Sequence, residues 1–271
     1  MTTRIATVLL VLVSSSVLLD ARASDLKQME QALNATYKGK TMILRNFYRG
    51  KKLDYDAQGK LVKGGRSGPW TLCAGIEVGK VRLRPKNLTI NGTRIFLIPR
   101  SKDKFEHRPD EWVSIRVEMA SPPASMEPLH RLLATVFLSA EEKLADVVPD
   151  YWKGFFYGES TPEPRGGDGN AGAAYSYLGK DPSVTPPIPI HKPMPGYTPE
   201  ARDAKLQGTT VLFFVVDAQG GVADIRVVKP LGYGLDDNAV ETVRRWKFKP
   251  GVRNGRPVAV CLMVEVAFRS F

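Results

Sequence analysis

The strongest constraint on the fold lies near the C-terminal end of the chain, where apolar runs alternate with turn residues. The first two runs, residues 211–216 and 222–228, are rich in β-branched side chains, which favour strands. Residues 217–221, Asp-Ala-Gln-Gly-Gly, separate them and supply the glycines that a hairpin turn needs at positive φ. A third apolar run covers residues 258–268. The order predicts a hairpin and a later third strand in one antiparallel sheet.

Between the second and third runs, the spacing of apolar residues changes to steps of three and four. These side chains form one helical face, at Leu235, Ala239, Val243 and Trp246. Because such a face must be buried, the pattern predicts a helix over residues 235–246 that packs on the sheet. Pro250 cannot continue this helix. We therefore expect an α+β domain over residues 195–271, with a three-stranded antiparallel sheet and one packed helix.

This order of elements resembles the C-terminal domain of TonB-family energy transducers. The matching features are Tyr197-Thr198-Pro199, Gly208, residues 217–221, Leu235-Asp236, the Trp-Lys-Phe-Lys-Pro sequence at 246–250, and the alternating Val264, Val266 and Phe268. No single feature is specific, but their order and spacing together are. The resemblance covers the last quarter to third of the chain.

The resemblance implies a periplasmic domain that binds a TonB-dependent outer-membrane receptor, at a segment near the N-terminus of the receptor plug. Recognition would be strand addition, in which the partner pairs with an open edge of the sheet. The expected partner-binding residues lie on the last strand and around Tyr197: Tyr197, Pro199, Val260, Leu262, Val264, Val266 and Phe268. In the family, an inner-membrane proton-channel complex supplies the force for transport of substrates such as siderophores. A homodimer is a further option.

Residues 1–23 have the composition of a secretory signal peptide. Arg4 precedes a mostly apolar stretch, and Ala21-Arg22-Ala23 matches the small-x-small cleavage pattern. We expect cleavage after Ala23 and a periplasmic mature protein. The alternative is an uncleaved anchor in the inner membrane, facing the periplasm. Family transducers carry a histidine in this anchor, and residues 1–24 contain none.

Residues 24–157 predict a separate small antiparallel β unit with helices, of unknown role. Its strongest hairpin signal is Asn91-Gly92, between two apolar runs. Helices are expected at 26–35, at 129–138, and from a Ser139–Glu142 capping box toward Val148. The aromatic run 151–157 is expected to pack helix against sheet, with a ligand platform as the alternative.

Residues 158–194 are rich in Gly and Pro and cannot build a core, so they predict a linker that is stiff at its proline-rich end. Cys73 and Cys261 are expected to be buried thiols, with a disulfide between them as the alternative. Asp236 and Asp237 are expected to stabilise the positive N-terminal end of the helix.

Composition and motifs argue against several functional classes. A net charge of +11 suits an anionic partner, but the basic residues form no dense run and no nucleic-acid module is found, so nucleic acid is not expected. The three histidines, His107, His130 and His191, lie at no metal-ligand spacing. Without a catalytic motif, we expect no enzyme and no metal or cofactor. The alternative function is a non-energised structural or ligand-binding envelope protein. Its β unit would hold an acidic glycan or lipid headgroup, and its C-terminal domain would serve docking or dimerisation.

Overall fold

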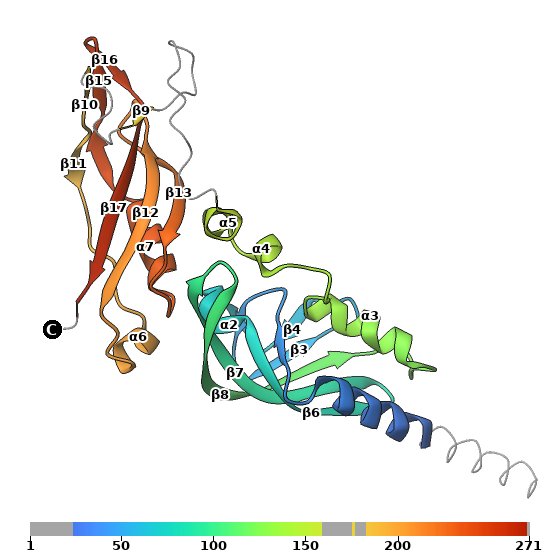
Figure 1. Ribbon diagram of the computed structural model, residues 1–271. Coiled ribbons are helices and arrows are strands. Elements are labelled where there is room, and N and C mark those ends of the chain that lie inside the picture. Colours follow the sequence, from blue (N-terminus) through green and yellow to red (C-terminus); the bar gives the residue numbers. More distant parts are fainter. Residues whose placement is uncertain (1–23, 159–174, 177–182, 270–271) are drawn as a thin grey trace, which may run out of the picture. The chain divides into compact units, whose positions relative to one another are not determined.

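The computed structural model describes residues 24–158, 175–176 and 183–269 (Figure 1). The expected signal peptide, residues 1–23, and the greater part of the expected linker lie outside the described residues. The chain divides into two compact units. The first contains Met1–Gly68, Cys73–Ile95 and Pro109–Glu141, and the second contains Pro69–Leu72, Phe96–Arg108 and Glu142–Phe271. Two short segments from the middle of the N-terminal half therefore belong to the second unit.

A six-stranded sheet forms the first unit, in the order β1-β6-β7-β8-β3-β4. β3 pairs with β8 in parallel, whereas the β1–β6, β6–β7 and β3–β4 pairs are antiparallel. The strands are β1 (Thr41–Ile43), β3 (Lys52–Tyr55), β4 (Leu61–Lys63), β6 (Gly75–Arg84), β7 (Asn87–Ser101) and β8 (Lys104–Glu118). A separate two-stranded ladder joins β2 (Tyr48–Arg49) to β5 (Arg66–Ser67).

Two helices bury their apolar faces with this sheet, as the sequence predicts. One covers residues 24–37 and the other is α3 (Met126–Val136). Leu33, Leu129 and Leu133 from these helices join strand side chains in one buried cluster. The strand residues alternate between this cluster and the opposite face, which carries the exposed Trp112.

The expected hairpin at Asn91-Gly92 is wrong. β7 runs through both residues, and the turn that precedes it lies at residues 85–86. A Cβ added to Gly92 would lie 2.2 Å from the carbonyl oxygen of Glu77 on β6, so no larger residue fits here. The register of the two strands shifts close by, between Val78 and Lys80. The glycine thus accommodates a close approach at an irregularity inside the sheet.

The capping box expected at Ser139 is displaced by four residues. The helix is α4 (Leu144–Val147), and the N–H of Lys143 in front of it donates to Asp146 Oδ2 at 3.3 Å. Lys143 and Asp146 have the same three-residue spacing as the expected pair, Ser139 and Glu142. The helix that follows Lys143 buries Ala145.

α5 (Asp150–Tyr157) contains the aromatic run, and its packing supports the structural interpretation of that run. Trp152 is fully buried, and its ring meets the ring of Trp70 edge-on at 5.0 Å between centroids. Trp70 opens α2 (Trp70–Cys73) and also contacts Phe105 and Phe156. These rings form an aromatic core within the second unit.

The second unit contains the expected α+β domain. Its sheet has the order β13-β12-β17-β9, and β12 pairs antiparallel with both β13 and β17. The elements are β9 (Tyr175–Ser176), β12 (Gly208–Val216), β13 (Val222–Lys229), β17 (Val260–Phe268), α6 (Pro199–Asp203) and α7 (Leu235–Val243). The three strands and the helix expected from the sequence are confirmed.

α7 packs its apolar face on this sheet: Leu235, Ala239 and Val243 are fully buried. The helix ends three residues earlier than expected, because the N–H of Trp246 donates to the Val243 carbonyl in a tightened last turn. Trp246 is nevertheless only 2% exposed, and its ring meets Phe214 of β12 at 6.1 Å between centroids. The indole therefore belongs to the core of this domain.

The proline-rich end of the expected linker forms strands. β11 (Ile188–His191) pairs antiparallel with β14 (Lys247–Lys249), and β10 (Val184–Thr185) pairs with β15 (Gly251–Arg253), which forms a hairpin with β16 (Arg256–Val258). β10 and β11 lie at the edges of their small sheets, where a residue without an N–H is tolerated. Residues 184–191 are therefore part of the C-terminal fold.

Cys73 and Cys261 are both buried and free, as expected. Within the described ranges, no helix has the length and apolar character needed to cross a membrane.

Candidate functional site

β17 presents a long backbone edge. On one side it pairs with β12 at nine successive positions without a register shift. On the other side β9 pairs only with Val260 and Cys261, in parallel. From Leu262 to Phe268, this second side has no strand neighbour among the residues that the structure describes (Figure 1). An extended peptide could pair with the backbone there.

The side chains expected to bind the partner face inward instead. Val260, Val266 and Phe268 are buried, and Leu262 and Val264 are half-buried. The exposed face of β17 carries the alternate residues, Met263, Glu265 and Ala267, which the sequence did not single out. The alternation of side chains along residues 258–268 is the sequence signal that separates the inward-facing set from the outward-facing set. These inward-facing side chains pack β17 on the sheet.

Tyr197 lies next to the end of β17, whereas Pro199 does not contribute to this contact. The Tyr197 ring meets Phe268 edge-on at 5.6 Å between centroids, and its hydroxyl donates to the Leu206 carbonyl at 3.1 Å. Pro199 is exposed at the first position of α6, where a residue without an N–H is favoured. The side chain of Thr198 caps this helix by accepting from the N–H of Ala201 at 3.1 Å.

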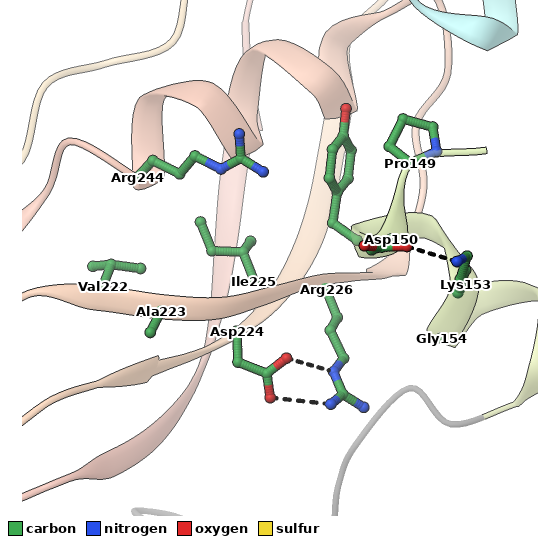
Figure 2. A pocket seen from close by; sticks show the side chains of 11 residues that line it. Pro149, Asp150, Lys153, Gly154, Val222, Ala223, Asp224, Ile225, Arg226 and Arg244 are labelled. Carbon is green, nitrogen blue, oxygen red and sulfur yellow. Dashed lines mark hydrogen bonds and ion pairs between the residues drawn. The ribbon is translucent and has the colours of Figure 1, made fainter. Parts of the chain in front are cut away.

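The opposite edge of the sheet, β13, is bordered by α5. A groove of about 930 Å³ lies between them, and Figure 2 shows its lining residues. Its charged groups are paired. Lys153 Nζ lies 2.6 Å from Asp150 Oδ1, and both Nε and Nη2 of Arg226 donate to the Asp224 carboxylate at 3.0 Å (Figure 2). The groove therefore offers paired charges rather than an unmatched cation or anion.

Asp237 holds α5 at this edge. Its Oδ1 accepts from the Tyr151 hydroxyl at 2.7 Å and from the indole N–H of Trp152 at 3.3 Å. Arg244 of the same domain lies over the Tyr151 ring, 5.5 Å from its centroid. Burial raises the pKa of the Asp237 carboxyl, and burial together with the adjacent carboxylate raises the pKa of Tyr151. The contact is thus a buried polar link between α5 and α7.

Comparison with known proteins identifies the domain that carries these two edges. Residues 193–270 match the model of the family described as the Gram-negative bacterial TonB protein C-terminal. Residues 193–270 are a TonB C-terminal domain.

Two similar proteins carry the name Protein TonB. Protein TonB of Vibrio cholerae serotype O1 is 31% identical over 91 residues, which are 31% of this chain and 37% of that protein. Protein TonB of Xanthomonas campestris pv. campestris is 37% identical over 75 residues, which are 27% of this chain and 34% of that protein. This chain therefore spans about a third of the length of the curated relatives it matches. The solution NMR structure of the Pseudomonas aeruginosa TonB CTD aligns with 20% identity and a TM-score of 0.27, over 35% of this chain and 95% of that one.

In this TonB C-terminal domain, the two acidic residues that begin α7 do more than face the helix N-terminus. Asp236 is fully buried and accepts from the backbone N–H groups of Leu231 and Gly232 at 2.8 and 2.7 Å. Burial raises the pKa of Asp236 to about 6, against the opposing effect of these hydrogen bonds. Asp236 thus fixes the loop between β13 and α7.

No metal centre accompanies the TonB C-terminal domain in the described part of the chain. Over those residues, no group of three or more His, Cys, Asp and Glu side chains is placed to hold a metal ion.

Proposed function

We propose that the TonB C-terminal domain of this chain binds an extended segment of an outer-membrane receptor. The segment would add as a strand to the free edge of β17. The observation that carries the proposal is the edge from Leu262 to Phe268, which has no strand neighbour among the described residues although the other side of the same strand is fully paired. Such an edge supplies alternating N–H and C=O groups in a row, which is the surface that strand addition uses. The similarity to proteins named TonB favours a receptor as the source of the segment.

In this proposal, backbone hydrogen bonds provide the affinity, and inward-facing side chains hold β17 in position. Val266 and Phe268 are buried and keep β17 on the sheet, and Tyr197 packs against Phe268 at its end. The exposed Met263 and Glu265 would lie beside alternate side chains of the added strand. The receptor plug segment would therefore be selected by extended conformation first and by side-chain contacts second.

The wider role that we propose is energy-coupled transport through an outer-membrane receptor, with siderophores as a substrate class. It includes a periplasmic location for the domain and coupling to an inner-membrane proton-channel complex. A second copy of the chain is a competing occupant of the same edge, because an open strand can pair with itself.

Two neighbouring proline substitutions test strand addition. Since the β12–β17 register is uninterrupted, successive N–H groups of β17 point alternately toward β12 and toward the free edge. Of Val264→Pro and Glu265→Pro, one therefore removes an N–H that binds β12, and the other removes one that faces outward. The first variant should lose stability. The second should stay folded and bind a fluorescent plug-segment peptide about tenfold more weakly, by anisotropy.

Alanine at the same two positions is the matched control, because it keeps the N–H group. Both alanine variants should bind the peptide as the parent does. The proposal is wrong if the folded proline variant binds with parental affinity. It is also wrong if the parent binds no receptor plug segment while sedimentation shows β17 paired in a dimer.

A further inference from the structure

Two segments of the C-terminal domain carry positive charge and no negative charge. Residues 183–194 and 244–260 together contain seven Lys or Arg residues and no Asp or Glu, a net +7 of the +11 carried by the whole chain. In the sequence the two segments lie far apart. The fold places them side by side, because β11 pairs with β14 and β10 pairs with β15. Their cations therefore gather on one part of the domain without forming a basic run.

The face that β11 and β14 share carries apolar and cationic side chains together. Ile188 is opposite Lys249 in the register, and His191 is opposite Lys247. Residues opposite each other in an antiparallel pair have their side chains on the same face. Phe248 lies between the two lysines and is buried on the other face, whereas both lysines are exposed. The outer face of this strand pair is therefore apolar on β11 and cationic on β14.

The apolar side chains of this region are exposed as a group. Ile188 is 57% exposed, Ile190 is 72% exposed and Met194 is 75% exposed. In the part of the chain that the structure describes, seven large apolar side chains are exposed, and these three lie within residues 188–194. A single exposed apolar side chain needs no explanation, but a group of them is typical of a surface that contacts a protein or a membrane.

The lysines have no acidic partner within the protein. Among the described residues, no carboxylate forms an ion pair with Lys192, Lys247 or Lys249. Lys192 Nζ lies instead over the buried ring of Trp246, 4.7 Å from its centroid. Asp217 belongs to the turn that bonds to β14, but its Oδ1 accepts from two N–H groups of that turn, at 2.9 and 2.8 Å. The positive charge is therefore available to an anionic partner.

A proline makes the open edge of β11 unsuitable for strand addition. The N–H of Phe248 donates to the Gly220 carbonyl at 2.9 Å, so it points away from β11. Pro189 is opposite Phe248, and its nitrogen therefore faces the open side of β11, where a proline has no N–H to donate. Prolines on edge strands block pairing with another strand. A partner of this region is therefore contacted by side chains rather than by the backbone edge.

Anionic lipid fits these side chains better than a second copy of the chain. A second copy would bring the lysines of one protomer against those of the other, and like charges repel. At a membrane surface, exposed apolar side chains enter the boundary between headgroups and acyl chains, while lysines meet the negative charge of the lipid. The protruding Ile190 and Met194 and the unpaired lysines are the two parts of such a contact.

We propose that this β11 surface binds the face of a membrane that contains anionic lipid. The β11 surface is defined as Ile188, Ile190, Lys192, Met194, Lys247 and Lys249. Ile190 and Met194 enter the interface, and the lysines contact headgroup phosphates. This contact uses a different part of the domain from the β17 edge and does not rest on receptor binding.

Vesicle sedimentation with the full chain tests the charge of the β11 surface. At an ionic strength of about 0.15 M, the parent should bind phosphatidylglycerol-containing vesicles at least about tenfold more tightly than phosphatidylcholine vesicles. Lys247→Glu with Lys249→Glu should weaken binding to the anionic vesicles at least about tenfold. The matched control is Arg82→Glu with Arg84→Glu, two exposed residues at the same spacing on β6. The control makes the same change in net charge and should weaken binding less than about threefold.

A second pair of variants tests the apolar contact without changing the net charge. Ile190→Ser with Met194→Ser should weaken binding to the anionic vesicles about threefold or more, because less apolar area enters the interface. The control is Val62→Ser, which alters a 67% exposed residue of the first unit and should leave binding within about twofold of the parent. In Ile190→Trp, vesicles should shift the emission of the added indole to shorter wavelengths, and in Val62→Trp they should not.

Several outcomes would overturn the proposal. Equal losses in the two Glu double variants would mean that net charge alone attracts the vesicles. Unchanged binding in Ile190→Ser with Met194→Ser would mean that no side chain enters the interface. Full displacement from vesicles by inorganic phosphate would assign a soluble anion site. Tighter binding of polyglutamate than of vesicles, lost in the Lys247 and Lys249 double variant, would assign the surface to an acidic polypeptide.

Two measurements keep the result specific to the β11 surface. The thermal midpoint of each variant should match the parent, because the substituted side chains are exposed. If the Glu double variant unfolds, Lys247→Gln with Lys249→Gln should still weaken vesicle binding at least about threefold. The affinity for a receptor plug-segment peptide should be unchanged in every variant of the β11 surface. Failure of lipid binding therefore leaves strand addition at β17 standing, and the reverse also holds.

Discussion

The two edges of the C-terminal sheet, β13 and β17, differ in regularity and in how far other elements cover them. β13 is bordered by α5, which Asp237 holds through Tyr151 and Trp152. β13 also contains an irregularity: its register with β12 shifts around Asp224, which has φ +46°. β17 is regular over nine residues, and β9 covers only its first two. One edge is therefore bent and covered, and the other is straight and open.

An open, regular edge is an aggregation hazard that proteins usually block with bulges, charges or a covering element. This domain uses such protection on β13 and leaves most of β17 without it. The proposed strand addition concerns the edge that lacks this protection among the described residues.

Removing Trp246 should damage both edges at once. The indole is buried against Phe214 and Phe248, and its N–H donates to the Pro193 carbonyl at 3.0 Å. Trp246→Ala should lower the free energy of unfolding by about 3–5 kcal/mol in denaturant titration. Trp112→Ala is the control, because Trp112 is 52% exposed and its loss should change stability by less than about 0.5 kcal/mol. A loss below about 1 kcal/mol for Trp246→Ala would contradict the core assignment.

The buried carboxyl of Asp236 should make the free energy of unfolding of the C-terminal domain depend on pH. Its pKa of about 6 in the folded state exceeds the value of about 3.9 for an unfolded chain, so the folded state binds the proton more tightly. The stabilising effect is complete below about pH 4 and is lost as the pH rises through about 6, by roughly 3 kcal/mol. Asp236→Asn cannot titrate and should flatten this slope in urea titrations. A parent and variant with parallel pH profiles would refute the prediction.

Releasing α5 should make the β13 edge resemble the β17 edge. Asp237→Ala leaves the Tyr151 hydroxyl and the Trp152 indole N–H without their acceptor, which should cost about 1–3 kcal/mol. Hydrogen exchange of the β13 amides should then speed up, while that of β17 stays as in the parent. Tyr157→Phe removes an exposed contact of α5 with Asp146 and should leave β13 unchanged. Unchanged exchange in Asp237→Ala would show that α5 is held by packing alone.

The exposed side chains of β17 should matter least. Glu265→Ala and Met263→Ser keep every backbone group of the open edge and remove no buried contact. Stability should change by less than about 0.5 kcal/mol, and affinity for a plug-segment peptide should stay within about twofold of the parent. A larger loss of affinity with unchanged stability would shift recognition from the backbone to these side chains.

The parts of this fold that the sequence predicts are those with a local pattern. The hairpin around residues 217–221 and the helix from Leu235 follow from turn glycines and from the spacing of apolar residues. The open edge does not follow from the length of the last apolar run, because β17 pairs with β12 over all nine of its residues. Which side chains of β17 face inward is set by its packing in the sheet, where Val260, Val266 and Phe268 are buried.

Other parts depend on contacts between distant residues and have no local pattern. Tyr151 and Asp237 are 86 positions apart, and no local sequence pattern around either residue predicts their contact. The prolines within residues 186–189 predict a linker. β11 nevertheless pairs with β14, because an edge strand tolerates a residue without an N–H group. Asn91-Gly92 has the sequence of a hairpin turn, but Gly92 lies within β7, where the backbone of Glu77 on β6 comes too close for a side chain.

The pairing of residues 184–191 along the flank of the C-terminal domain stores a length of chain. If a load pulls on the chain ahead of Val184 while β17 is held by a partner, β10 and β11 are the first elements to detach. The eight residues from 184 to 191 would extend to about 28 Å. The attachment point would then move to Pro193, whose carbonyl is held by the buried Trp246. Under such a load, the chain ahead of the domain would lengthen while β12 and β17 keep their pairing.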